Sequence, residues 1–323
     1  MKKEDLKIVF LGTPEFAVES LAALVDNGCN VAAVVTMPDK IAGRGHKLLQ
    51  SDVKRYAVEK GIPVLQPANL KDKAFLNELR LINADLFVVI AFRMLPEAVW
   101  QMPRLGTFNL HASLLPRYRG AAPINRAVMN GEQVTGVTTF FLKHEIDTGD
   151  IIAQKQIEIG PDEDAGSVHD RLMRLGSEMV SETIQSIIDS DGKVQTVPQP
   201  EGEFVPAPKI FTEDCEIDWH KTCEHVRNHV RGLAPYPAAF TMIANETGNT
   251  LKLKIFKGRR ADDMLSAGAR PGELLLERKR MAVMCADAPY EITELQLQGK
   301  KRMSTEAFLL GYHPAKIATR DEQ

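Results

Sequence analysis

Two polar side chains, two positions apart, interrupt an otherwise apolar run in the segment NLHASLLPRYRGAAPI, which extends from Asn109 to Ile124. If this run is a β-strand, Asn109 and His111 point to the same face. An amide donor beside an imidazole can stabilise a developing oxyanion, and a histidine can also relay a proton. A single histidine on a strand is more often a core residue, but the irregular Ser-Leu-Leu-Pro and Arg-Tyr-Arg-Gly that follow favour a ligand-binding loop.

The segment HEIDTGD, from His144 to Asp150, falls in a predicted turn between two strands. Its acidic residues and glycine suit an ordinary hairpin as well as a functional site. Asp147 is the candidate of interest, because a carboxylate beside His111 would orient the imidazole ring and favour its protonated form. The meeting of Asp147 with His111 is therefore a spatial hypothesis.

Other segments are less specific. The turn LGTPEFA has only Gly12 of the GxGxxG pattern, and no GxxxxGK[ST] occurs, which disfavours nicotinamide and ATP enzymes. The long connection from Asp39 to Lys54 contains Arg44 and is either a functional loop or a plain surface loop. His225 and His229 have helical spacing, but they lack the glutamate of a zincin and no zinc-binding spacing fits, so we predict no metal site.

The elements that must position these residues follow from hydrophobic periodicity. Short β-branched runs alternate with helical stretches in the first half, which predicts a parallel sheet covered by helices. Thr13 is expected to cap a helix that has Pro14 at its first position. The predicted strands cover 7–11, 31–35, 64–65, 86–90 and 107–111, with a hairpin of 137–142 and 151–159 and helices at 52–60, 72–82, 122–129 and 165–188.

Composition changes after residue 191. Residues 192–209 contain four prolines and few bulky apolar residues, as expected of an extended linker. A helical segment near 221–231 and several short β-rich runs follow, which predict a small antiparallel OB-like barrel. We therefore expect a Rossmann-like catalytic domain over 1–191, a linker over 192–209 and a barrel domain over 210–323.

The totals exclude some classes of protein. The chain has 323 residues and a net charge of −3; residues 1–208 hold 22 Lys and Arg against 27 Asp and Glu, and residues 209–323 hold 18 against 16. So slight a basic excess is far from that of a dedicated nucleic-acid binder. No run approaches the ~20 apolar residues of a membrane span, and four cysteines without a CxxC fit a reducing compartment. We expect a cytoplasmic protein.

Taken together, these segments resemble the methionyl-tRNA formyltransferase family over essentially the whole chain. The pair HASLLPRYRGAAPI and DTGD is highly specific for folate-dependent formyl transfer. The long GRG loop, the linker and the IDW and GKKRMS segments favour the tRNA-directed branch. AFRMLP stands where the family often has AYGLILP, which leaves the pterin-side wall unpredicted. The matching segments are FLGTPEFAV, AGRGHKL, NLHASLLPRYRGAAPI, DTGDI, IDW and GKKRMS.

The resemblance implies a function. It implies formyl transfer from 10-formyltetrahydrofolate to the amino group of initiator methionyl-tRNA, without a metal. It implies that Asn109, His111 and Asp147 form the catalytic set, that Arg44 meets the acceptor end of the tRNA and that the barrel contacts tRNA. Four residues of one loop would lie along the folate, namely Ser113, Leu114, Leu115 and Pro116.

Three alternatives stay open at this point. The acceptor could be a small amine, such as an amino sugar or glycinamide ribonucleotide, or the enzyme could hydrolyse formyl-folate. The basic loop and the mildly basic second half argue against both. The chain could also be a catalytically silent tRNA-binding module, against which the intact Asn109, His111 and Asp147 argue.

Overall fold

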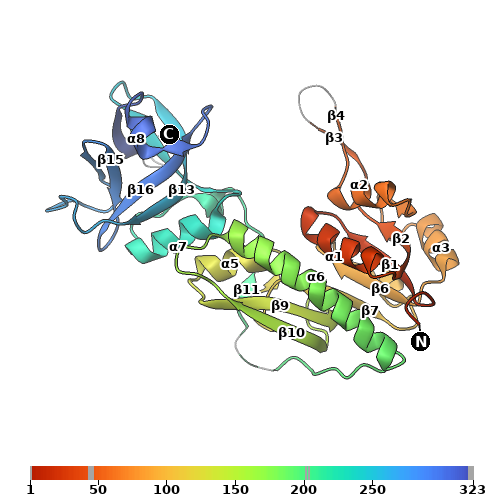
Figure 1. Cartoon of the computed structure of the whole chain (residues 1–323). Helices are drawn as coiled ribbons and strands as arrows, with labels where there is room; N and C mark the ends of the chain where they lie inside the picture. The colour runs from red at the N-terminus through yellow and green to blue at the C-terminus, as the bar shows by residue number, and fades with distance from the viewer. Residues whose placement is uncertain (1, 43–46, 201, 203, 319–323) are drawn as a thin grey trace. The chain divides into compact units, whose positions relative to one another are not determined.

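The computed structural model describes residues 2–42, 47–200, 202 and 204–318. Its contacts divide the chain into two compact units (Figure 1). The first comprises the residues up to 120, 134–157 and 169–207, and the second comprises 121–133, 158–168 and the residues from 208 on. The predicted domain boundaries after 191 and 209 stay predictions. None of the described helices combines the length and apolar character that a membrane crossing needs.

A mostly parallel sheet forms the first unit, in the order β10-β9-β7-β6-β1-β2-β5. Strands β5, β2, β1, β6 and β7 are parallel, and β9 runs antiparallel to β7. Chain order along the sheet reverses between β1 and β6, and open α/β sheets bind ligands beyond the carboxyl ends of their strands at such a point. The Rossmann-like prediction is confirmed. The strands are β1 (Lys7–Gly12), β2 (Asn30–Val35), β5 (Val64–Leu65), β6 (Leu86–Ile90), β7 (Thr107–His111), β9 (Val134–Phe141) and β10 (Ile151–Glu158).

Helices cover both faces of this sheet. All five residues of β6 are buried, as expected of a central strand. Phe75 and Leu79 of α3 and Val99 of α4 pack in one apolar cluster with alternate residues of β1, β2 and β6. Leu110 of β7 points toward α6, where a Cβ on Gly176 would lie 2.7 Å from its Cδ2. The helices are α1 (Glu15–Asp26), α2 (Asp52–Glu59), α3 (Lys73–Ile82), α4 (Glu97–Trp100) and α6 (Ala165–Asp189).

The predicted cap of the first helix is wrong. Helix α1 begins at Glu15, and Pro14 rather than Thr13 is its N-cap, without a side-chain hydrogen bond. The reason lies in the dihedral angles of Pro14, φ −81° and ψ 174°, which are extended and place the proline before the helix. Among the described residues, none forms a hydrogen bond with the buried hydroxyl of Thr13.

Two connections contain more regular structure than the sequence predicts. The loop between β2 and α2 includes a short antiparallel pair, β3 (Lys40–Ala42) with β4 (Lys47–Leu49); Arg44 lies outside the described residues. After α6, Val197 forms a bridge with Ile151. Further on, β11 (Pro206–Ala207) pairs in parallel with β8 (Arg119–Gly120). The extended segment predicted as a linker is therefore hydrogen-bonded to the first unit.

An antiparallel sheet forms most of the second unit, in the order β14-β15-β16-β13-β12-β18, with β17 beside β16. Strands β14 and β18, at the two ends of this order, contact each other, so the sheet nearly closes. The predicted OB-like barrel is confirmed. The elements are α5 (Pro123–Met129), a 3-10 turn (Glu213–Cys215), α7 (Cys223–Leu233), β12 (Ala239–Asn245), β13 (Thr250–Arg260), β14 (Leu274–Glu277), β15 (Arg280–Met284), β16 (Pro289–Leu297), β17 (Met303–Ser304), α8 (Thr305–Leu309) and β18 (Pro314–Ala318).

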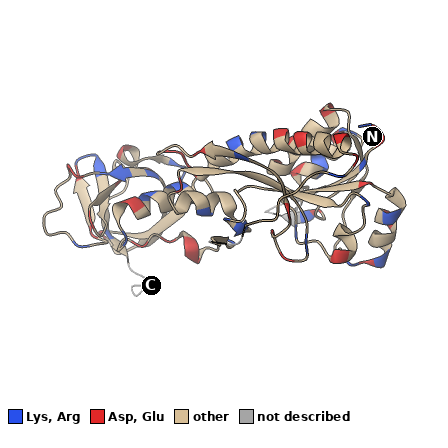
Figure 2. Ribbon diagram, turned by 90° about the horizontal axis from the view of Figure 1, so that it is seen from below, with Lys and Arg blue, Asp and Glu red and all other residues tan. Residues whose placement is uncertain are grey.

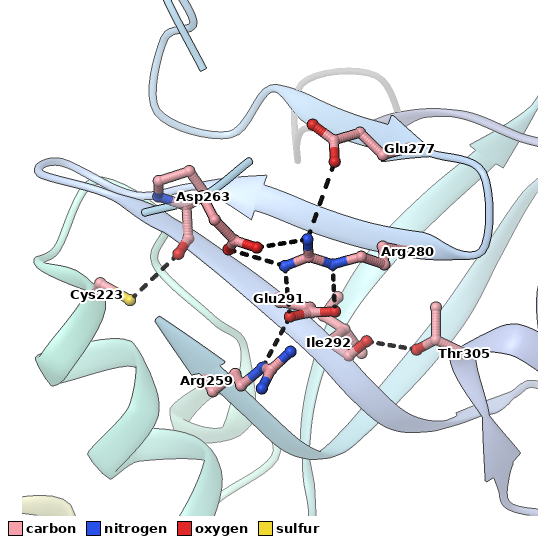
Figure 3. A network of polar contacts seen from close by, with 9 residues as sticks. Cys223, Arg259, Asp263, Glu277, Arg280, Glu291, Ile292 and Thr305 are labelled. Carbon is pink, nitrogen blue, oxygen red and sulfur yellow. Dashed lines mark hydrogen bonds and ion pairs between the residues drawn. The ribbon is translucent and has the colours of Figure 1, made fainter. Parts of the chain in front are cut away.

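A network of charged side chains joins three strands of this barrel (Figure 3). Glu291 of β16 is buried and accepts hydrogen bonds from Arg280 of β15 at 2.8 and 3.0 Å and from Arg259 of β13 at 2.9 Å. Arg280 also donates to Asp263. Hydrogen bonds from Arg280 hold the pKa of the Glu291 carboxyl below its usual value. Elsewhere, basic and acidic residues are interspersed along the ribbons of both units (Figure 2).

Candidate active site

His111 is the last residue of β7, at the carboxyl edge of the first unit's sheet. Its side chain is only 7% exposed, and Nε2 lies 2.8 Å from the carbonyl oxygen of Tyr118. A carbonyl can only accept, so Nε2 carries the hydrogen and donates it. Nδ1 lies 3.8 Å from Oδ2 of Asp147. Nδ1 is therefore the ring atom at which His111 can gain or lose a proton, and Asp147 faces it.

Asp147 lies in the turn between β9 and β10, where its φ of 55° is in the left-handed region. Non-glycine residues adopt this conformation uncommonly, Asp and Asn among the most frequent. Oδ2 of Asp147, besides facing His111, accepts a hydrogen bond from the Gly120 N–H at 3.0 Å. The structure thus brings together the histidine and the carboxylate that the sequence pairs only as a hypothesis, over 36 positions of chain.

Asn109 precedes His111 by two residues on β7. Leu110 points toward α6, so alternation along the strand turns Asn109 and His111 to the other face. Within the described part of the chain, no donor reaches the buried Oδ1 of Asn109. Leaving a buried carbonyl oxygen unpaired costs about 1–3 kcal/mol. An unpaired buried amide oxygen at the carboxyl edge of the sheet makes Asn109 a candidate for contact with a ligand or an ordered water.

The loop after β7 divides its side chains between the core and the surface. The Ser113 hydroxyl is buried and donates to the Arg117 carbonyl oxygen at 2.7 Å. Leu115 is 3% exposed, and its carbonyl oxygen accepts from Gln154 at 2.9 Å. Leu114 and Pro116 are half-buried. Of the four residues predicted along the folate, Leu114 and Pro116 therefore have side-chain surface to offer.

Sequence reasoning missed three residues that hold this site. The carbonyl of Tyr118 fixes the ring of His111, and the N–H of Gly120 fixes the carboxylate of Asp147. Gln199, from the segment predicted as a linker, donates to the backbone of the turn that carries Asp147. The RYRG motif contains Tyr118 and Gly120 and could have indicated that this loop belongs to the site. It could not have indicated which backbone atoms bind His111 and Asp147.

Groups for a metal ion are not found in the part of the chain that the structure describes. His225 is exposed and His229 half-buried, and burial lowers the pKa of the His229 imidazole. The four cysteines form no disulfide.

Two family models match this chain: Formyl transferase over residues 6–184 and Formyl transferase, C-terminal domain over residues 209–313. The chain is therefore a formyltransferase, with the fold of that class. A methionyl-tRNA formyltransferase from Bacteroides fragilis is 52% identical over 318 residues, which is 97% of each chain. The chain belongs to the methionyl-tRNA formyltransferase family.

Solved structures share the fold at low sequence identity. HypX from Aquifex aeolicus in complex with tetrahydrofolic acid is 19% identical, with a TM-score of 0.62 over 94% of this chain; the chain spans 46% of HypX. An N-formyltransferase from Helicobacter canadensis in complex with folinic acid and dTDP-3-aminofucose is 18% identical, with a TM-score of 0.62 over 92% of this chain and 100% of its own.

Proposed function

We propose that this protein transfers the formyl group of 10-formyltetrahydrofolate to the free amino group of methionyl initiator tRNA, and that Asn109, His111 and Asp147 carry the reaction. The observation that carries the proposal is the 3.8 Å approach of His111 Nδ1 to Asp147 Oδ2. This pair lies at the carboxyl edge of the sheet, in a chain whose sequence is 52% identical to a methionyl-tRNA formyltransferase.

The reaction needs an oxyanion stabiliser and a proton acceptor. The methionyl amine attacks the formyl carbon, a new C–N bond forms and the carbonyl oxygen becomes an oxyanion. The Asn109 amide and the Nδ1–H of protonated His111 stabilise this charge. Asp147 holds His111 and accepts the proton that the amine loses. When the tetrahedral intermediate collapses, the bond from the formyl carbon to the folate nitrogen breaks, and that nitrogen takes up the proton to give tetrahydrofolate.

The remaining assignments concern binding. The half-buried side chains of Leu114 and Pro116 support folate contact by their loop; for Ser113 and Leu115, contact is proposed through the backbone. Arg44 is proposed to meet the acceptor end of the tRNA. Residues 1–191 form the catalytic domain, residues 192–209 the linker and residues 210–323 the tRNA-binding domain in this proposal.

We also propose a cytoplasmic location. Cysteines in secreted proteins are commonly paired, whereas reducing compartments keep thiols free. The four free cysteines, three of them buried, support this location.

The test is a formylation assay of the purified chain with 10-formyltetrahydrofolate and one acceptor at a time. We expect formyl-methionyl-tRNA to form with charged initiator tRNA, and no formyl product with an amino-sugar nucleotide or glycinamide ribonucleotide. A faster reaction with either small amine would overturn the proposed acceptor. Tetrahydrofolate release without any acceptor would indicate a hydrolase, and no turnover at all would indicate a silent tRNA-binding module.

A further inference from the structure

Gln199 lies in the segment between α6 and β11, 52 positions after Asp147. Its Nε2 donates to two backbone carbonyls of that turn, to Asp147 O at 2.8 Å and to Gly149 O at 2.9 Å. Its Oε1 accepts a fork from Arg119, at 3.1 Å from Nε and 2.6 Å from Nη2. Both donor hydrogens and the acceptor oxygen of this side-chain amide are thus in use.

The orientation of this amide is fixed by chemistry. A backbone carbonyl only accepts and an arginine only donates, so the NH2 group must face the turn and the oxygen must face Arg119. A glutamate in the same place would keep the bonds from Arg119. It would, however, set an oxygen against the carbonyls of Asp147 and Gly149, where there is nothing for it to accept. The site therefore distinguishes Gln199 from its closest isostere.

The same segment also reaches the histidine side of the site. The Val205 carbonyl oxygen accepts from the Tyr118 N–H at 2.6 Å, and the Tyr118 carbonyl in turn accepts from His111. Gln199 is thus linked to the turn that carries Asp147 through its side chain, and Val205 is linked to His111 through the backbone of Tyr118. On the Asp147 side the turn needs support, because a left-handed φ of 55° is unfavourable for a residue with a side chain.

We propose that Gln199 is a positioning residue for formyl transfer, whose amide holds the Asp147 turn so that the carboxylate faces His111. This inference rests on the proposed role of Asp147. Gln199 touches no reacting atom in this proposal and acts through the turn. One residue of the segment predicted from composition as a spacer between domains, Gln199, is then required to position the Asp147 turn.

The first experiment compares kcat and both KM values for Gln199→Ala, Gln199→Glu and the wild-type chain. A displacement of about 1 Å in a catalytic group costs about a hundredfold in rate. We expect kcat to fall between about tenfold and a hundredfold in both variants, with both KM values within threefold of wild type. If Gln199 only fills space, Gln199→Glu will retain wild-type kcat, and the proposal fails.

The control is Gln195→Ala, an exposed glutamine of the same segment. It should retain kcat within twofold. Melting curves of all variants fix an assay temperature at which each is folded, so that a loss of folded protein does not count as a loss of rate. A Gln199→Ala chain that is folded and turns over at the wild-type rate refutes the proposal.

A double-mutant cycle with Asp147→Asn separates this proposal from the proposed function. If Gln199 acts through Asp147, adding Gln199→Ala to an Asp147→Asn chain with a low but measurable rate should lower that rate by less than threefold. If Gln199→Ala lowers the rate of the Asp147→Asn chain by the same factor as it lowers the wild-type rate, Gln199 does not act through Asp147. That result refutes the positioning role. An Asp147→Asn chain with near wild-type kcat refutes the catalytic assignment itself, whatever Gln199 does.

Discussion

Gly149, two residues after Asp147, lies where the structure leaves no room for a side chain. A Cβ at this position would be 1.5 Å from the carbonyl oxygen of Phe141 and 2.7 Å from its carbonyl carbon. Both are backbone atoms of β9, and the Leu142 N–H of the same peptide unit donates to Thr107 O at 2.8 Å, which holds this carbonyl in place. Since Cβ atoms essentially never approach closer than 3.0 Å, Gly149→Ala must shift the turn by about 1.5 Å.

The shift would be transmitted to Asp147, because the two residues share one short turn. At about a hundredfold in rate per 1 Å of misplacement, we expect Gly149→Ala to lower kcat by at least about a hundredfold. That loss corresponds to about 2.7 kcal/mol of transition-state stabilisation. The KM for the folate should change little, since the 113–116 loop leaves from a different strand.

The assay measures formyl-methionyl-tRNA formation with both substrates saturating, beside a thermal melt of each variant. Gly311→Ala is the matched control, because a Cβ there meets nothing within 4 Å and the glycine has no left-handed φ. It should leave kcat unchanged. A folded Gly149→Ala chain with kcat within threefold of wild type would refute the claim that this turn sets the rate through Asp147.

Three further outcomes are expected. Asn109→Ala should lower kcat by about a hundredfold or more with an unchanged melt, as removal of an oxyanion donor does; near-normal turnover would end its assignment. Glu291→Gln should destabilise the barrel by about 1–3 kcal/mol in urea unfolding. Arg280 depresses the pKa of the Glu291 carboxyl in the folded chain, so the stability that ionised Glu291 contributes is present above its unfolded pKa of about 4.3 and disappears as pH falls through its folded pKa. The free energy of unfolding of Glu291→Gln should therefore fall less than that of wild type on acidification. Parallel pH profiles of the two free energies would contradict this. Trp219→Phe removes a 3.2 Å hydrogen bond to Thr241 and should lower the melting midpoint without changing kcat; a specific loss of kcat would show a role outside the core.

Periodicity was sufficient for the parallel strands β1 and β6 of the first unit's sheet because each is short, apolar and followed by its own helix. The run LFVVI over 86–90 has no polar residue, and its only stable place is between two covered faces. The same reasoning failed at Thr13, because a threonine before a proline fits the N-cap pattern equally well whether the proline opens the helix or precedes it. The ψ angle of Pro14 decides whether the proline is the first helical residue or the residue before the helix, and local sequence does not specify that angle.

For the site, the sequence could identify residue types but not distances. Asn109 and His111 share a strand, so their common face follows from alternation alone. Asp147 reaches His111 through the pairing of β9 with β7, an antiparallel addition to a parallel sheet that no local pattern specifies. Gln199 was missed for a related reason. Its segment has the composition of a linker, and composition carries no information about which carbonyls an extended chain will meet.

The segments that favoured the tRNA-directed branch owe much of their sequence to the barrel itself. Ile217 and Trp219 of IDW are 6% and 5% exposed and belong to the core of the second unit. In GKKRMS, Arg302 pairs with Glu294 and Ser304 caps α8, while Lys300 and Lys301 are exposed. A motif can therefore identify a family through residues that build its fold. Of these two motifs, GKKRMS has the exposed cations, so a search for tRNA contacts should begin with exposed cations of the barrel and not with IDW.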